Sequence, residues 1–176
     1  MPLIPETGDG LPTANSYATV ADADAYHAAT MSADAWGELD LVEKEQRLVA
    51  ATRLLDSMFA WVGFPMRHGQ ALGFPRRDIS GRNGVAYPLR YIPREIRAAT
   101  IELALYLQDD ATSAATIGAE SVQEITLGPI GIKLAAGADA TTTKTSRPMI
   151  PLATMASIRQ WGDYLGGGGS VGRLVR

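Results

Sequence analysis

The chemistry that this chain could support centres on arginines interleaved with aromatic rings. Between residues 63 and 92, arginines alternate with Phe64, Phe74, Tyr87 and Tyr91. Guanidinium groups pair with phosphates and aromatic faces stack on unpaired bases, so this mixture is typical of single-strand nucleic-acid binding. The candidate contacts to DNA or to a neighbouring subunit are Arg67, Phe74, Arg76, Arg77, Arg82 and Arg90.

A structural role for the same residues stays open. The rings could anchor the segment on the core, while the arginines are solvated or paired with the acidic first third of the chain. Residues 1–63 carry a net charge of −7, residues 64–97 carry +5, residues 98–143 carry −5 and residues 144–176 carry +4, within a total of −3. Blocks of opposite sign on one subunit would suit head-to-tail contact between identical copies.

The C-terminus is a second candidate contact. Gly166 to Gly169 and Ser170 form a flexible linker, after which two apolar residues lie between two arginines. A tethered segment of this kind could dock on a partner protein, or it could be disordered, as chain ends often are. The residues concerned are Arg173, Leu174, Val175 and Arg176.

Patterns for catalysis are missing from the sequence. The chain has no cysteine, and its two histidines, His27 and His68, lie in different segments without metal-ligand or triad spacing. The glycine run lacks the Lys-Ser/Thr ending of a phosphate-binding loop, and no Gly-x-Ser-x-Gly occurs. We therefore expect no catalytic residue, no cofactor and no metal, and a protein that is not an enzyme.

The sequence also gives no reason to expect contact with a membrane. Pro2, Pro5, Glu6 and Asp9 stand where a secretory signal would need basic and then apolar residues. No apolar run approaches the roughly 20 residues that span a bilayer. We expect the protein to be made in the cytoplasm and to have no membrane partner.

The elements that must position these residues are mainly helical. Residues 1–16 form an extended or mobile arm. Capping signals at Thr19 and Asp40 and apolar residues at helical spacing predict a short helix after residue 19 and a longer one over 40–62. Pro93 opens a central helix with two apolar faces, and a last helix covers about 150–165. The long loop 63–92 has too many glycines and prolines for a long helix or a central strand.

One β-hairpin interrupts the helical pattern. Alternating apolar residues around Gly128-Pro129 predict two strands within residues 121–134. Because a lone hairpin is marginally stable in water, it either lies on the helices of its own chain or is completed by hairpins of neighbouring copies. The predicted fold class is mainly α, a small bundle of three to four helices with one β-hairpin and extended N- and C-terminal arms. Residues 17–165 form the domain and residues 166–176 the tail.

Several short motifs occur in an order that is similar to a family of tailed-phage and prophage proteins. The motifs are Ser16-Tyr17, Ala21 to Tyr26, Ala35-Trp36, Ala50 to Asp56, Trp61-Val62-Gly63, Leu72 to Arg76, Ile92-Pro93 and Leu127 to Ile130. With these motifs the chain resembles head-tail connector proteins, also called adaptor or head-completion proteins, over nearly its whole length. Related sequences are often described as DnaT-like single-stranded-DNA-binding proteins.

The resemblance implies a virion structural protein of the neck, at the head-tail interface, made in the host bacterial cytoplasm. It implies a dodecameric homo-oligomeric ring that sits under the portal protein and extends the DNA channel without reading sequence. The downstream neck, stopper or tail protein would contact either the 63–92 loop or the hairpin. The portal-docking residues implied by the resemblance are Trp161, Tyr164, Leu165, Arg173, Leu174, Val175 and Arg176.

The alternative takes the DnaT-like description literally and makes the chain a single-stranded-DNA-binding protein whose surface is the loop. The overall charge favours the connector, because proteins that grip phosphates are normally basic and this chain has a net charge of −3 and a pI near 5.4. A channel that lets DNA slide past needs no net positive charge.

Overall fold

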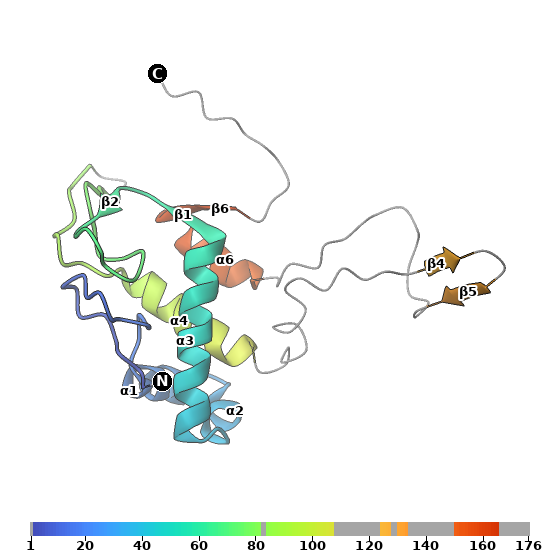
Figure 1. Cartoon of the computed structure of the whole chain (residues 1–176). Coiled ribbons are helices and arrows are strands. Elements are labelled where there is room, and N and C mark those ends of the chain that lie inside the picture. The colour runs from blue at the N-terminus through green and yellow to red at the C-terminus, as the bar shows by residue number, and fades with distance from the viewer. Residues whose placement is uncertain (1, 82–83, 108–123, 128–129, 134–149, 166–176) are drawn as a thin grey trace. The chain divides into compact units, whose positions relative to one another are not determined.

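The computed structural model describes residues 2–81, 84–107, 124–127, 130–133 and 150–165 (Figure 1). The chain divides into two compact units. The larger combines Met1–Asp109 with Ile150–Arg176, and the smaller is Asp110–Met149. Among the described residues, the larger unit contains five helices and two small sheets, and the smaller contains one two-stranded sheet. The fold is mainly α with a small hairpin, so the predicted fold class is confirmed.

The helices begin where local capping signals predicted. Thr19 and Asp40 each accept a hydrogen bond from the backbone N–H three residues on, and the acidic side chains of Asp22 and Glu43 accept from the cap in return. The five-residue helix that contains Trp36 was not predicted, because five residues are too few to show a period. The described helices are α1 (Val20–Ala28), α2 (Ala33–Gly37), α3 (Leu41–Met58), α4 (Arg94–Tyr106) and α6 (Leu152–Ile158).

The core of the larger unit lies where α4 packs between α3 and α6 (Figure 1). Leu48 and Leu55 from α3, Ile96 and Leu103 from α4, and Ile158 from α6 are fully buried. α4 also buries side chains on a second face, as its sequence predicted for a central helix. Burying such a large aliphatic side chain contributes about 1.5–3 kcal/mol, so this cluster is a main source of stability.

Two predicted helices end earlier than expected. α3 stops at Met58 rather than at residue 62, and α6 stops at Ile158 rather than at residue 165. The chain beyond each helix forms a strand, and β1 (Phe59–Trp61) pairs antiparallel with β6 (Gly162–Tyr164). Extended backbone places the rings of Phe59 and Trp61 on one face, where they stack with centroids 5.1 Å apart. This pairing joins segments about a hundred residues apart, which explains why helical periodicity could not reveal it.

The loop after α3 has more structure than its glycine and proline content predicted. Short strands β2 (Phe64–Pro65) and β3 (Arg76–Arg77) pair antiparallel, and Ser80 bridges to Ala86. Leu72, Phe74 and Ile79 from this loop are buried in the core. The loop is therefore a folded part of the larger unit.

The N-terminal segment has no helix, as expected for an extended arm, but it is fastened to the larger unit. Pro5 bridges to Ser16, and the Glu6 carboxylate, 3% exposed, accepts hydrogen bonds from the backbone N–H groups of Gly8, Gly10 and Leu11 at 2.8–2.9 Å. A carboxylate that accepts hydrogen bonds from three backbone N–H groups fixes the turn around it. Of the two predicted alternatives for this segment, extended or mobile, the structure shows an extended one.

The smaller unit contains the predicted hairpin. β4 (Glu124–Leu127) pairs antiparallel with β5 (Ile130–Lys133), and Leu127 lies opposite Ile130. The predicted turn at residues 128–129 and the rest of the 121–134 range lie outside the described residues. Whether the hairpin is covered by its own helices or by neighbouring copies stays a prediction.

No helix among the described residues is long and apolar enough to cross a membrane.

Candidate nucleic-acid interface

The β2–β3 pair brings an exposed aromatic ring and an exposed arginine together. Phe64 lies opposite Arg77 in the register, and the guanidinium carbon of Arg77 lies 6.0 Å from the centre of the Phe64 ring. Phe64 is 60% exposed. Gly63 makes this approach possible, because its φ is +75° and a Cβ there would lie 2.4 Å from the Arg77 carbonyl oxygen. The pair is a cation–π contact in reach of solvent.

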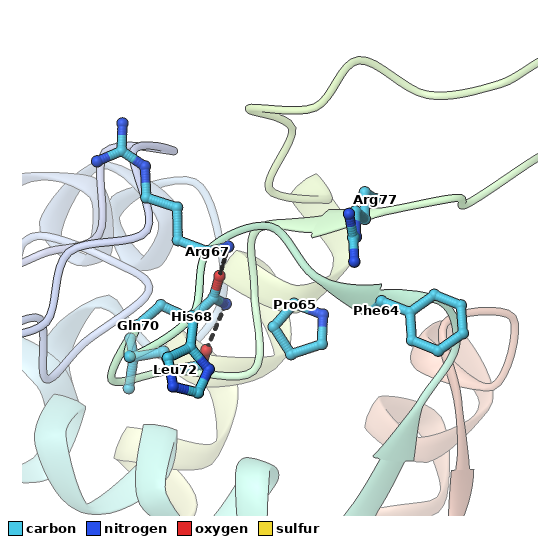
Figure 2. Close-up of a pocket in the computed structure, with 8 residues that line it drawn as sticks. Phe64, Pro65, Arg67, His68, Gln70, Leu72 and Arg77 are labelled. Carbon is cyan, nitrogen blue, oxygen red and sulfur yellow. Dashed lines mark hydrogen bonds between the residues drawn. The ribbon is translucent and has the colours of Figure 1, made fainter.

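A hollow of about 320 Å³ opens beside this pair (Figure 2). In Figure 2, Phe64 and His68 lie on either side of the Pro65 ring, while the Arg67 guanidinium extends away from them. The eight residues that line the hollow are Phe64, Pro65, Arg67, His68, Gly69, Gln70, Leu72 and Arg77. We call Phe64, Pro65, Arg67, His68 and Arg77 the Phe64 face.

Gln70 holds the wall of the hollow in place. Its side-chain N–H₂ donates to the carbonyl oxygens of Leu72 at 2.7 Å and Pro75 at 3.0 Å, and its side-chain oxygen accepts from the Arg67 backbone N–H at 2.9 Å. Figure 2 shows the bonds to Arg67 and Leu72 as dashed lines. Because both ends of the amide are engaged with backbone groups, the Gln70 side chain is a support and not a reader of bases.

Arg76, the neighbour of Arg77, has a different environment. Its guanidinium donates to the carbonyl oxygens of Val62 at 2.6 Å, Gly63 at 2.6 Å, Gly73 at 3.0 Å and Trp61 at 3.1 Å. Burial lowers the pKa of this guanidinium from its usual value. The side chain therefore ties β1 and the following turn to the loop, so its donors are not free for the DNA or inter-subunit contact that the sequence predicted.

Phe74 and Trp161 belong to the core. Phe74 is fully buried and makes edge-to-face contacts with the rings of Trp61 and Trp161. Trp161 is 2% exposed and packs against Tyr87, whose ring stacks on that of Tyr91 with centroids 4.9 Å apart. The predictions that Phe74 contacts DNA and that Trp161 docks on a portal are wrong, because neither ring can reach a partner. The structural alternative, aromatic anchoring of the loop, is confirmed for these rings.

The remaining predicted contacts are scattered. Arg90 is exposed, and its guanidinium lies 3.1 Å from the carboxylate of Asp9. Tyr164 is half-buried in β6 against Phe59, and the Leu165 backbone N–H donates to the Met58 carbonyl oxygen. Arg82 and residues 173–176 lie outside the described residues, so their predicted roles stay predictions. Of the predicted loop contacts, the structure places Arg67 and Arg77 together at one hollow.

A half-buried carboxylate ties the loop to α3. Asp56 of α3 accepts hydrogen bonds from the Tyr17 hydroxyl at 2.6 Å and, at 2.9 Å each, from the Trp61 indole N–H and the Gly73 backbone N–H. Burial raises the pKa of the Asp56 carboxyl, while the three donors act in the opposite direction. Burial, with the charge of Asp56, also raises the pKa of Tyr17 well above its usual value. The network joins the N-terminal segment, α3 and the loop.

The sequence analysis named Phe64 among the loop rings but missed Pro65 and His68 as its neighbours in one site. The signal was present, since these residues and Arg67 occur within the five positions 64–68. Spacing alone did not show that Arg77 returns beside Phe64. No group of three or more metal-ligating side chains exists in the part of the chain that the structure describes.

An exposed ring and a guanidinium at the edge of a hollow are the two kinds of group that single-strand-binding surfaces use. The chain belongs to the family described as "Putative DnaT-like ssDNA binding protein", whose model matches residues 1–176. This confirms the DnaT-like part of the resemblance, while the phage connector identity stays a prediction. No curated protein and no solved structure matches the chain.

Proposed function

We propose that this protein binds single-stranded DNA without sequence preference through the Phe64 face. The observation that carries the proposal is the exposed Phe64 ring with the Arg77 guanidinium above it, beside a hollow. Stacking of bases on aromatic rings needs no particular base, because every base has a π-face. The description of the matching family supports this function over the connector.

The geometry suits a strand held without reading its sequence. Sequence readout needs donors and acceptors that are free and fixed in place. The Gln70 amide is fixed, but its groups are committed to backbone partners. Arg67 and Arg77 are exposed, and no carboxylate among the described residues pairs with either, so both can meet phosphates.

The net charge of −3 opposes binding to negatively charged DNA and so limits the expected affinity. With two phosphates neutralised by Arg67 and Arg77, the logarithm of the binding constant should fall with the logarithm of salt concentration at a slope of about −1.4. We therefore expect moderate affinity at low salt that is largely lost at high salt.

Fluorescence anisotropy with a labelled thymidine oligonucleotide tests the proposal. Arg77→Ala should weaken binding at least about fivefold and reduce the salt slope by about 0.7. The matched control is Arg97→Ala, since Arg97 is also exposed but lies on α4, where its charge acts on Asp22 of α1. Equal losses in the two variants, or no binding by the wild type at low salt, would refute the proposal.

A connector function is the second candidate, and the overall charge favours it. The Arg76 guanidinium is bonded to backbone carbonyls, which leaves few free cations among the described residues for a protein that must hold a strand. A ring under the portal that lets DNA pass requires no grip. In this candidate the protein is a subunit of a homo-oligomeric, dodecameric ring in the virion neck, contacting the portal and a downstream neck or tail protein.

Co-assembly separates the two candidates. If the connector proposal holds, the protein should form rings with the portal protein of the same phage, and deletion of 166–176 should abolish them. Arg77→Ala should leave ring formation intact. Rings that form equally well without residues 166–176 would exclude the tail as the docking segment, and failure of the full chain to bind the portal would exclude the connector.

A further inference from the structure

The hollow beside Phe64 has the size and lining of a site for one planar group. Its volume of about 320 Å³ is at the lower end of the range of about 300–1,000 Å³ for small-ligand sites. Phe64, Pro65 and His68 provide ring surfaces in its lining, and the Arg77 guanidinium provides a cation beside Phe64 (Figure 2). A flat ring surface beside a cation matches a nucleotide, which joins a flat base to an anionic phosphate.

We infer that this hollow receives one unpaired base of the bound strand against the Phe64 and Pro65 rings, with an adjoining phosphate at Arg77. This inference rests on the proposed single-strand binding and adds that the bases, rather than the backbone alone, enter the protein. A base inside a duplex is stacked and paired, so its faces cannot reach Phe64. The site therefore discriminates single strands from duplexes.

The rings are held in position before any ligand arrives. Phe64 and Pro65 pair with β3, and Gly63 has the positive φ that the close approach to Arg77 requires. The opposite wall is fixed by the Gln70 side chain, which bonds to the backbone at Arg67 and Leu72. A surface that is already ordered loses little conformational entropy on binding, so stacking contributes its full strength.

The lining predicts which bases bind. The Gln70 amide cannot read a base edge, because its donors and acceptor are engaged. Every base should therefore enter, in the order of its stacking strength.

A strand without bases tests the inference directly. The probes are a thymidine oligonucleotide and an abasic oligonucleotide of equal length, with equal numbers of phosphates, both labelled at the same end. The wild type should bind the thymidine strand at least about fivefold more tightly than the abasic one. Phe64→Ala should remove this difference by weakening only the thymidine complex, and Phe64→Trp should keep it.

Arg77→Ala provides the matched control, since it should weaken both complexes. Because Phe64 is 60% exposed, thermal unfolding should show Phe64→Ala folded with a melting temperature near that of the wild type. Equal affinity of the wild type for the two strands would overturn the base site while leaving single-strand binding through Arg67 and Arg77 standing. No binding of either strand would overturn both.

Discussion

The same substitution at two adjacent arginines, Arg76 and Arg77, should affect different properties of the protein. Arg76→Ala removes a guanidinium that donates four hydrogen bonds to backbone carbonyls, and Arg77→Ala removes one that lies over an exposed ring. The first variant should lose stability and the second should lose DNA binding. Because the two changes delete the same atoms from neighbouring positions, each is the control for the other.

The stability loss follows from the four bonds of Arg76. The bond to Val62 is exposed, so water can replace it, whereas the bonds to Trp61, Gly63 and Gly73 are part-buried. At about 1 kcal/mol for each part-buried bond, Arg76→Ala should reduce the free energy of unfolding by about 3 kcal/mol. For a chain of this length, that corresponds to a fall in melting temperature of about 6–12 °C. Arg77→Ala should stay within about 0.5 kcal/mol of the wild type.

Urea unfolding followed by circular dichroism, together with a thermal melt, measures both losses. Arg76→Lys should recover less than half of the stability, because an ammonium group cannot reproduce the planar fork of donors. Anisotropy with a thymidine oligonucleotide should show that Arg76→Ala binds normally at a temperature where it is folded. If the free energy of unfolding of Arg76→Ala lies within 0.5 kcal/mol of the wild type, the stabilising role of the Arg76 hydrogen bonds is refuted.

Three further predictions concern Tyr26, Asp56 and Gly8. The Tyr26 hydroxyl donates a hydrogen bond to Glu102, and this bond, together with burial, raises the pKa of Tyr26 to about 12. Stability should therefore fall as pH rises from 10 to about 12, and Tyr26→Phe should remove that part of the loss. Absorbance at 295 nm measures the tyrosine titration, and urea unfolding measures the stability. Burial raises the pKa of Asp56 above 3.8, so the folded state holds the carboxyl proton more tightly than the unfolded state. The contribution of Asp56 to stability should therefore decline as pH rises from 3.8 through the folded-state pKa. Urea titrations should show that Asp56→Asn flattens this decline. Gly8→Ala should cost about 2 kcal/mol or more, because φ is +100° and the new Cβ would lie 2.4 Å from a carbonyl oxygen.

Matched variants decide each of these outcomes. Gly69→Ala has a φ of +84° with no atom within 4 Å of the new Cβ, so it should cost only about 1 kcal/mol, and equal losses at Gly8 and Gly69 would contradict the contact argument. A Tyr26→Phe protein with the alkaline profile of the wild type would contradict the Tyr26 assignment. Stability of the wild type that rises relative to Asp56→Asn between pH 4 and 7 would contradict the dominance of burial at Asp56.

Much of the helical architecture could be predicted because its signals are local. The capping residues of α1 and α3 act within one helical turn, and the apolar spacing of α4 records directly which faces are buried. The hairpin of residues 124–133 was predictable because its strands are adjacent in the chain. Local signals failed at Phe59 and Tyr164, which were predicted to be helical but pair with each other as strands. No short window contains both partners of that sheet.

The amino-acid sequence by itself determined that the chain is mainly helical, where its blocks of charge lie, and that arginines and aromatic rings are mixed between residues 63 and 92. The tertiary structure decided which of these side chains are free to bind. Arg76 and Arg77 are chemically identical, but on a strand successive side chains point to opposite faces, so one guanidinium reaches backbone carbonyls and the other reaches solvent above Phe64. Phe74 is buried and Phe64 is exposed because the packing of Trp61 and Trp161 surrounds only the former. Burial depends on contacts between distant segments, and therefore only the folded chain could assign it.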